Sequence, residues 1–174
     1  MDDNECRVCP PPSLPLVHLN PGQVLMTGKP TVVSTVLGSC VSVTMFNATR
    51  PFAAICHGML PDCNGKGCSG CVEKLKYVDC SIIHMVRHFD KLDIDLRSVN
   101  VKLFGGAEVL QVGSATKQRT SVGKQNIEAA HKILSKIGIT PSVTDIGGST
   151  GRKILFYTHT GDVFLKRLKR QLSV

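Results

Sequence analysis

Short runs of apolar and β-branched residues, bounded by turn-forming residues, follow one another along most of the chain. Runs of this length and composition are typical of β-strands. The sequence therefore predicts a protein built mainly of strands. The expected strands cover residues 18–20, 23–26, 31–37, 41–47, 51–60, 99–104, 142–146, 153–157 and 162–166.

Two other segments carry apolar residues at helical spacing. Residues 77–92 form the first, which predicts an amphipathic helix with Ile82, Ile83, Val86 and Phe89 near one face. Residues 126–137 form the second predicted helix, which is followed by a glycine that can cap its C-terminus. Two helices can cover a sheet. The expected fold class is therefore α+β, a layered and mostly antiparallel β-sheet domain with two main helices.

The length of 174 residues favours one domain, since a chain of this size can bury a single core. We expect an irregular N-terminal arm over residues 1–17, because this segment contains three consecutive prolines. The folded domain is expected over residues 18–168, with a Gly/Cys/Lys-rich insertion at 62–76. Residues 169–174 then form a basic tail.

Composition limits the expected cellular location of the protein and the expected kinds of partner. Hydrophobic residues make up 42% of the chain, but no apolar run approaches the roughly 20 residues that span a bilayer. The acidic N-terminus does not resemble a signal peptide, so we expect a cytoplasmic protein without membrane insertion. The net charge of +8 favours an acidic partner surface. With only 5% aromatic residues, stacking recognition of nucleic acid is poorly supported, and no nucleic-acid partner is expected.

The strongest candidate for chemistry is the pair Cys40 and His57. A cysteine thiol is mostly protonated at neutral pH, and a nearby imidazole can remove its proton and activate it as a nucleophile. The alternative is a buried core cysteine and a hydrogen-bonded core histidine. Gly38 and Ser39 interrupt two strand-like runs just before Cys40, so the thiol is expected at a strand edge beside backbone N–H groups. Such N–H groups can form an oxyanion hole.

Five short phrases give the chain a resemblance to a known family. In order along the chain they are residues 37–41 (LGSCV), 57–61 (HGMLP), 102–107 (KLFGGA), 122–126 (VGKQN) and 144–153 (TDIGGSTGRK). Their order and spacing resemble those of the chemoreceptor glutamine deamidases of the CheD family, from about residue 18 to 168. The resemblance implies a layered fold shared with bacterial toxin deamidases.

The resemblance also implies roles for individual residues. The nucleophile of the family falls on Cys40 and its base on His57. A hydroxyl residue six positions before the nucleophile completes the family's site, and that position is Ser34 here, although the family pattern has threonine. Thr35 is the adjacent alternative. Ser34 and Thr35 point to opposite faces of a strand, and because positions 34 and 40 share parity, alternation favours Ser34.

The function implied by the resemblance is that of a protein-glutamine glutaminase. It would convert specific glutamines of methyl-accepting chemotaxis receptors to glutamate through a Cys/His thioester mechanism, with no cofactor required for catalysis. Its partners would be the cytoplasmic helices of chemoreceptors and a CheC-type phosphatase. Two alternatives stay open. One is a non-enzymatic chemotaxis adaptor that binds receptor or phosphatase, and the other is a different cysteine hydrolase, such as a protease, or a transglutaminase.

The cysteine-rich insertion is a separate candidate site. Cys63, Cys68 and Cys71 are followed by Cys80 at the start of the first predicted helix. Four thiolates can hold zinc tetrahedrally. They can also hold an iron–sulfur cluster, although the short gap from Cys71 to Cys80 does not match the ferredoxin type with the same first spacing. Disulfides or unmodified thiols are the alternatives.

Overall fold

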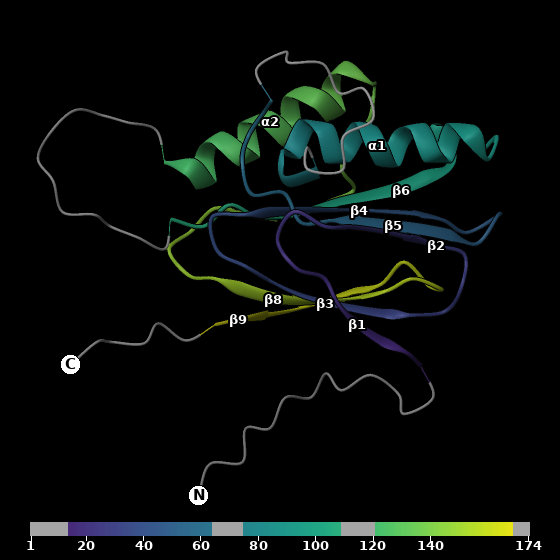
Figure 1. The fold of residues 1–174 in the computed structure, drawn as a ribbon, viewed down its shortest axis with the longest axis horizontal. Coiled ribbons are helices and arrows are strands. Elements are labelled where there is room, and N and C mark those ends of the chain that lie inside the picture. The colour runs from purple at the N-terminus through teal and green to yellow at the C-terminus, as the bar shows by residue number, and fades with distance from the viewer. Residues whose placement is uncertain (1–13, 64–74, 109–120, 169–174) are drawn as a thin grey trace, which may run out of the picture.

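The structure is a computed structural model that describes residues 14–63, 75–108 and 121–168. Within these ranges the chain forms three layers (Figure 1). Their elements, in chain order, are β1 (Leu16–His18), β2 (Val24–Thr27), β3 (Val32–Leu37), β4 (Val41–Asn47), β5 (Phe52–Cys56), α1 (Val78–Lys91), the 3-10 turn η2 (Leu96–Ser98), β6 (Val99–Gly105), α2 (Val122–Lys136), β7 (Val143–Ile146), β8 (Arg152–Tyr157) and β9 (Val163–Arg167).

The strands form two sheets that pack face to face. One sheet has the order β2-β5-β4-β6-β7, and the other has the order β1-β3-β8-β9. The pairs β1–β3 and β6–β7 are parallel, and the other strand pairs are antiparallel. Helices α1 and α2 cover the outer face of the five-stranded sheet, as Figure 1 shows. The predicted α+β class, with mostly antiparallel layers and two main helices, is confirmed.

Strands β4 and β5 are buried on both faces, because a layer packs against each side of their sheet. Val43 and Met45 of β4 face the helices and join a cluster with Met85 and Phe89 of α1. On the other face, Ile55 of β5 joins a second cluster between the two sheets. Burial from both sides explains why these strands have nearly continuous apolar runs. Each large side chain buried in this way stabilises the fold by about 1.5–3 kcal/mol.

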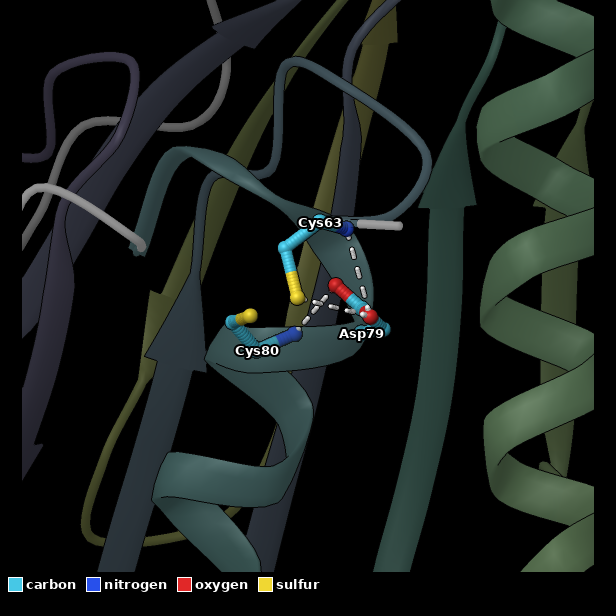
Figure 2. Close-up of side chains that lie close together, drawn as sticks. All are labelled: Cys63, Asp79 and Cys80. Atoms are coloured by element: carbon cyan, nitrogen blue, oxygen red, sulfur yellow. Dashed lines mark hydrogen bonds between the residues drawn. The ribbon is translucent and has the colours of Figure 1, made fainter. Parts of the chain in front are cut away.

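The helices are amphipathic, and α1 begins with an acidic turn. The Asp79 Oδ1 accepts a hydrogen bond of 2.6 Å from the backbone N–H of Cys80, as Figure 2 shows. A carboxylate here is favourable because the first N–H groups of a helix have no partner within the helix. Helix α1 has 14 residues and α2 has 15. No helix in the described ranges is long and apolar enough to cross a membrane.

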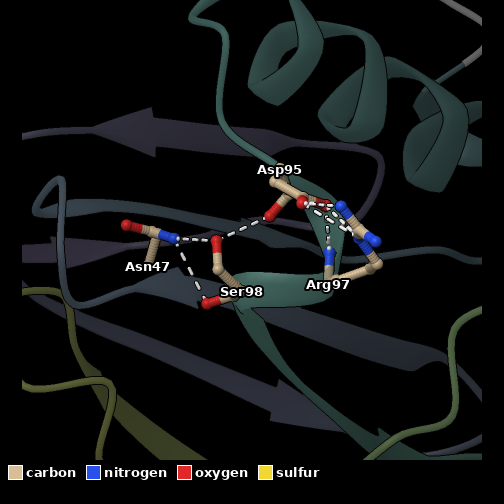
Figure 3. Close-up of polar contacts among 4 residues, drawn as sticks. All are labelled: Asn47, Asp95, Arg97 and Ser98. Carbon is tan, nitrogen blue, oxygen red and sulfur yellow. Dashed lines mark hydrogen bonds and ion pairs between the residues drawn. The ribbon is translucent and has the colours of Figure 1, made fainter.

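A polar network joins the far end of β4 to the turn before β6 (Figure 3). The Asn47 Nδ2 donates to the Oγ and to the backbone oxygen of Ser98, at 2.7 and 3.2 Å. Asp95 caps the turn by accepting from the N–H of Arg97 at 2.9 Å. The Asp95–Arg97 ion pair is exposed and adds little stability by itself. The network fixes the pairing of β4 with β6 at the end away from Cys40.

Several boundaries differ from the predicted ones. The predicted strand 51–60 is shorter, since β5 ends at Cys56. Strand β1 begins at Leu16 and pairs with β3, so the end of the expected N-terminal arm belongs to a sheet. Helix α2 begins at Val122, where Ser121 caps it by accepting from the N–H of Lys124 at 3.2 Å. The predicted start at residue 126 overlooked this cap. Most of the expected arm and insertion, and all of the expected tail, lie outside the described residues.

Candidate active site

Cys40 lies on the short connection that carries the chain from one sheet to the other. Strand β3 of the four-stranded sheet ends at Leu37, and β4 of the five-stranded sheet begins at Val41. The carbonyl of Cys40 accepts from the N–H of Gly106 at 2.7 Å. Gly105 has φ of 110°, and a Cβ there would collide with the Cys40 carbonyl oxygen. The paired glycines therefore allow two backbones to meet and hold the half-buried Cys40 in place.

The register between β4 and β5 places His57 and Cys40 on the same face of the sheet. Thr44 pairs with Ile55, and Val41 forms an antiparallel bridge with Gly58 through hydrogen bonds of 3.0 and 2.8 Å. The same register pairs position 42 with His57. Continued by one residue, it makes Cys40 the diagonal neighbour of His57 on the same face. Diagonal neighbours in an antiparallel pair lie within reach of long or aromatic side chains.

A hydroxyl group fixes the orientation of the imidazole. The Thr35 Oγ1 lies 2.7 Å from Nδ1 of His57 and 2.8 Å from the backbone oxygen of Leu19. The carbonyl can only accept, so the single hydroxyl proton of Thr35 goes to Leu19. Nδ1 must then be the donor to Oγ1, and Nε2 carries the lone pair in the neutral ring. Nε2 is buried and has no hydrogen-bond partner among the described residues.

Thr35, and not Ser34, is therefore the hydroxyl residue at the imidazole. Thr35 shares a face of β3 with Val33 and Leu37, which point toward the other sheet. Alternation turns the Ser34 side chain to the opposite face. The parity argument for Ser34 fails because the chain changes sheets between β3 and Cys40, so alternation along β3 does not continue to Cys40.

Burial keeps both reactive groups neutral in the free protein. It raises the pKa of the Cys40 thiol above its ordinary value of 9.0, and the residue's own backbone N–H partly offsets this. Burial also lowers the pKa of His57 below 6.5, with a partial offset from the backbone carbonyl of Leu19. The resting pair is thus a thiol and a neutral imidazole, and a thiolate requires proton transfer between them.

Asn126 of α2 connects the segments that carry Cys40 and His57. Its Nδ2 donates to the backbone oxygen of Ser39 at 2.9 Å and to that of Met59 at 3.0 Å. The side chain is fully buried, and its Oδ1 has no partner in the described part of the chain. The two acceptors lie one residue before Cys40 and two residues after His57, so Asn126 fixes the separation of the two segments.

Arg152 holds the segment that contacts Gly105. Its fully buried guanidinium donates to the Asp145 Oδ1 at 2.7 Å and also to the backbone oxygens of Asp145 and Gly147. The N–H of Gly147 in turn donates to the oxygen of Gly105 at 2.8 Å. Residues 144–153, one of the five phrases of the family resemblance, therefore hold the glycine turn whose N–H binds the Cys40 carbonyl.

Sequence reasoning did not identify Asn126 or Arg152 as site residues. A signal for Asn126 was present, because Asn126, Ala130 and Leu134 are all buried at four-residue spacing. A polar residue within an apolar helical stripe indicates a buried hydrogen-bonding role. Arg152 lies in the phrase 144–153, but nothing in the pattern marks its burial, since it begins a short strand directly after a glycine-rich turn.

The structure brings together two of the four cysteines predicted to bind metal. Cys63 and Cys80 lie beside Asp79, and one ligand atom from each of the three residues lies within 4.8 Å of the others. Asp79 was not among the predicted ligands. Cys68 and Cys71 lie outside the described residues.

A thiol on the same sheet face as a hydroxyl-held imidazole, at the junction of two sheets, provides the groups that a cysteine-dependent amidohydrolase needs. Comparison with known proteins agrees with this class. The family model described as CheD chemotactic sensory transduction matches residues 59–167. The chain belongs to the CheD family.

Several curated relatives match along most of their length. The probable chemoreceptor glutamine deamidase CheD 2 of Geobacter sulfurreducens is 48% identical over 159 residues, covering 91% of this chain and 94% of that protein. The probable chemoreceptor glutamine deamidase CheD of Maridesulfovibrio salexigens is 37% identical, covering 90% and 94%. The one of Thermococcus kodakarensis is 31% identical, covering 87% and 92%.

Among solved structures, the Bacillus licheniformis hypothetical protein YfiH aligns with a TM-score of 0.45 and 13% identity. The alignment covers 72% of this chain and 49% of that one, so the chain spans about half the length of YfiH.

Proposed function

We propose that this protein is a chemoreceptor glutamine deamidase that uses Cys40 as nucleophile and His57 as base. The observation that carries the proposal is the Thr35–His57 hydrogen bond beside Cys40, in a chain that belongs to the CheD family. The relatives named above are called probable chemoreceptor glutamine deamidases. Release of ammonia from a chemoreceptor fragment by the purified protein tests the proposal.

The reaction begins with proton transfer from the Cys40 thiol to Nε2 of His57. The sulfur attacks the side-chain amide carbon of the substrate glutamine, forming a C–S bond and a tetrahedral oxyanion. The C–N bond then breaks, and His57 protonates the departing ammonia. The resulting thioester is hydrolysed by water that His57 activates, which regenerates the thiol and leaves glutamate. One water is consumed and one ammonia is released.

The oxyanion needs donors that are already oriented before the reaction. The backbone N–H of Cys40 is the first candidate, because it lies close enough to its own sulfur to lower the pKa of the thiol. The connection that carries this N–H is fixed by hydrogen bonds to Gly106 and Ala107. Asn126 then maintains the distance between this donor and the His57 segment.

The substrate proposed from the family is a glutamine on the cytoplasmic helices of a chemoreceptor. The net charge of +8 favours approach to an acidic helical surface through long-range attraction. Met59 and Leu60 are exposed apolar residues directly after the His57 segment, where a helix could pack. A CheC-type phosphatase partner stays a prediction. An adaptor would keep its effect on signalling in a Cys40→Ala variant, whereas a deamidase would lose it.

If Thr35 orients His57, replacing Thr35 should lower activity much more than replacing its neighbour Ser34. In Thr35→Val the shape is kept but the hydroxyl is lost, so Nδ1 of His57 loses its partner. We expect kcat to fall roughly 10- to 100-fold, the equivalent of a buried hydrogen bond worth about 1–3 kcal/mol. Ser34→Ala is the matched control and should leave kcat nearly unchanged. Thr35→Ser should recover much of the activity. Equal losses in Thr35→Val and Ser34→Ala would remove Thr35 from this role.

If Cys40 and His57 are both neutral in the free protein, the rate of Cys40 alkylation should depend on pH. Because the pKa of Cys40 is raised above 9.0, its reaction with iodoacetamide should be slow between pH 6 and 8 and should accelerate above pH 9. Mass spectrometry of the Cys40 peptide separates this thiol from the other cysteines. A fast reaction that stays constant down to pH 6 would indicate a preformed thiolate–imidazolium pair and would contradict the neutral resting state.

A further inference from the structure

A second cluster of reactive side chains lies where the segment after His57 meets the start of α1. Cys63 lies at the end of the described part of that segment, and Asp79 and Cys80 occupy the first turn of α1 (Figure 2). We infer that Cys63, Asp79 and Cys80 bind one Zn²⁺ ion. This inference does not rest on the deamidase reaction, and the metal would not take part in it.

The spacing of the donor atoms fits tetrahedral zinc. With Zn–S near 2.3 Å and Zn–O near 2.1 Å, a tetrahedral site separates sulfur from oxygen by about 3.6 Å and two sulfurs by about 3.8 Å. The Cys63 Sγ lies 3.7 Å from the Asp79 Oδ2. All three donor atoms lie within 4.8 Å of one another, so a small movement of the Cys80 side chain completes the set. Water or a further donor can take the fourth position.

The carboxylate is already oriented for this role. Its Oδ1 accepts from the N–H of Cys80 at 2.6 Å, which holds the group in place at the helix start. Its Oδ2 faces Cys63 and accepts from the backbone N–H of that residue, with an N–O distance of 3.4 Å. The oxygen that accepts from the N–H of Cys80 and the oxygen that faces the thiol are therefore different atoms. Asp79 can ligate a metal without giving up its hydrogen bond to the first turn of α1.

Donor chemistry selects the metal. Two sulfur donors are soft ligands, which favour zinc over magnesium or calcium. Cys80 is only 4% exposed, and an ionised thiol there needs a nearby positive charge. The N-terminus of α1 supplies part of that charge, and the metal supplies the rest. Binding would release the thiol protons of Cys63 and Cys80, so the affinity should fall as the pH is lowered.

The site would join two segments that already pair. Leu60 bridges to Tyr77 in parallel, and the N–H of Val78 donates to the oxygen of Leu60 at 2.8 Å. A Cβ at Gly58 would lie 2.6 Å from the Val78 side chain, so the backbones pack closely just after His57. A metal at Cys63, Asp79 and Cys80 would hold these two segments together at the end of the contact farthest from His57. We therefore expect hydrogen exchange in residues 58–63 and 77–80 to speed up when zinc is removed.

Metal analysis of untagged protein, purified anaerobically without added metal, is the test. We expect about one equivalent of zinc, and substituted Co²⁺ should give the absorption of a tetrahedral site with thiolate ligands. Cys63→Ser and Cys80→Ser should each weaken zinc binding by at least about 100-fold. Replacing residues that only contact metal ligands already lowers metal affinity about 10- to 100-fold. Asp79→Asn keeps an oxygen that can accept from the N–H of Cys80 but loses the charge, and it should also bind zinc more weakly.

Cys40→Ser is the control, because it removes a thiol outside the cluster and should keep the full zinc content. Less than about a tenth of an equivalent of zinc in the wild type would overturn the inference. Unchanged zinc affinity in Asp79→Asn, or a Cys63–Cys80 disulfide in the anaerobic protein, would also overturn it. Iron in place of zinc would contradict the assignment of the metal.

Discussion

Replacement of Cys40 by alanine should abolish deamidation without unfolding the protein. The proposed nucleophile is lost, so kcat/KM should fall by a factor on the order of 10⁴ or more. The side chain is only half-buried and the connection is held by backbone hydrogen bonds, so stability should change by less than about 1 kcal/mol. Ammonia release measures the activity, and thermal unfolding followed by circular dichroism measures the fold.

Cys56 offers a matched control for this variant. It lies next to His57 in the chain, but its side chain is fully buried on the helix side of the sheet. Cys56→Ala should therefore lose stability and keep deamidation activity. If Cys40→Ala retained turnover, or if both variants lost activity equally at unchanged fold, Cys40 would not be the nucleophile.

Replacement of His57 by glutamine should have the second largest effect. The amide can occupy much of the space of the ring but cannot act as a general base, so kcat/KM at neutral pH should fall about 10²- to 10⁴-fold. The remaining activity would depend on spontaneous ionisation of Cys40, whose pKa is raised above 9.0. Activity of the variant should therefore increase about tenfold per pH unit up to that pKa.

The wild type should behave differently across the same pH range. Its base is neutral at pH 7 because burial lowers the pKa of His57 below 6.5. Activity should therefore fall only as the pH drops through the lowered pKa, where the imidazole becomes protonated, and should be level near neutrality. Parallel pH profiles for the wild type and His57→Gln would contradict the assignment of His57 as base.

Much of the fold could be predicted from the sequence, because its pattern is locally consistent. Strand β4 was predicted with its observed bounds, and α1 to within one residue at each end. These elements have strong apolar patterns and clear flanking residues. The start of α2 was missed because a glycine follows its first residue. That glycine is needed for packing, since a Cβ at Gly123 would lie 2.6 Å from the oxygen of Gly106.

The sequence pointed to Cys40 and His57, whose catalytic roles stay predictions, and it named Thr35 only as the alternative to Ser34. Strand alternation favoured Ser34, whereas the observed partner of His57 is Thr35, because Cys40 belongs to a connection between two sheets. The contacts of Asn126 join residues 87 and 67 positions away in the chain. Local periodicity carries no information about such contacts, which arise only when the layers pack.

Peptide mapping by mass spectrometry of the cytoplasmic region of a chemoreceptor from the same organism, after incubation with the purified protein, tests the central claim most directly. The proposed mechanism predicts that defined glutamines become glutamates while the receptor backbone stays intact, and that Cys40→Ala leaves every glutamine unchanged. Cleaved receptor, amine-crosslinked glutamines, or equal conversion by the wild type and Cys40→Ala would contradict it.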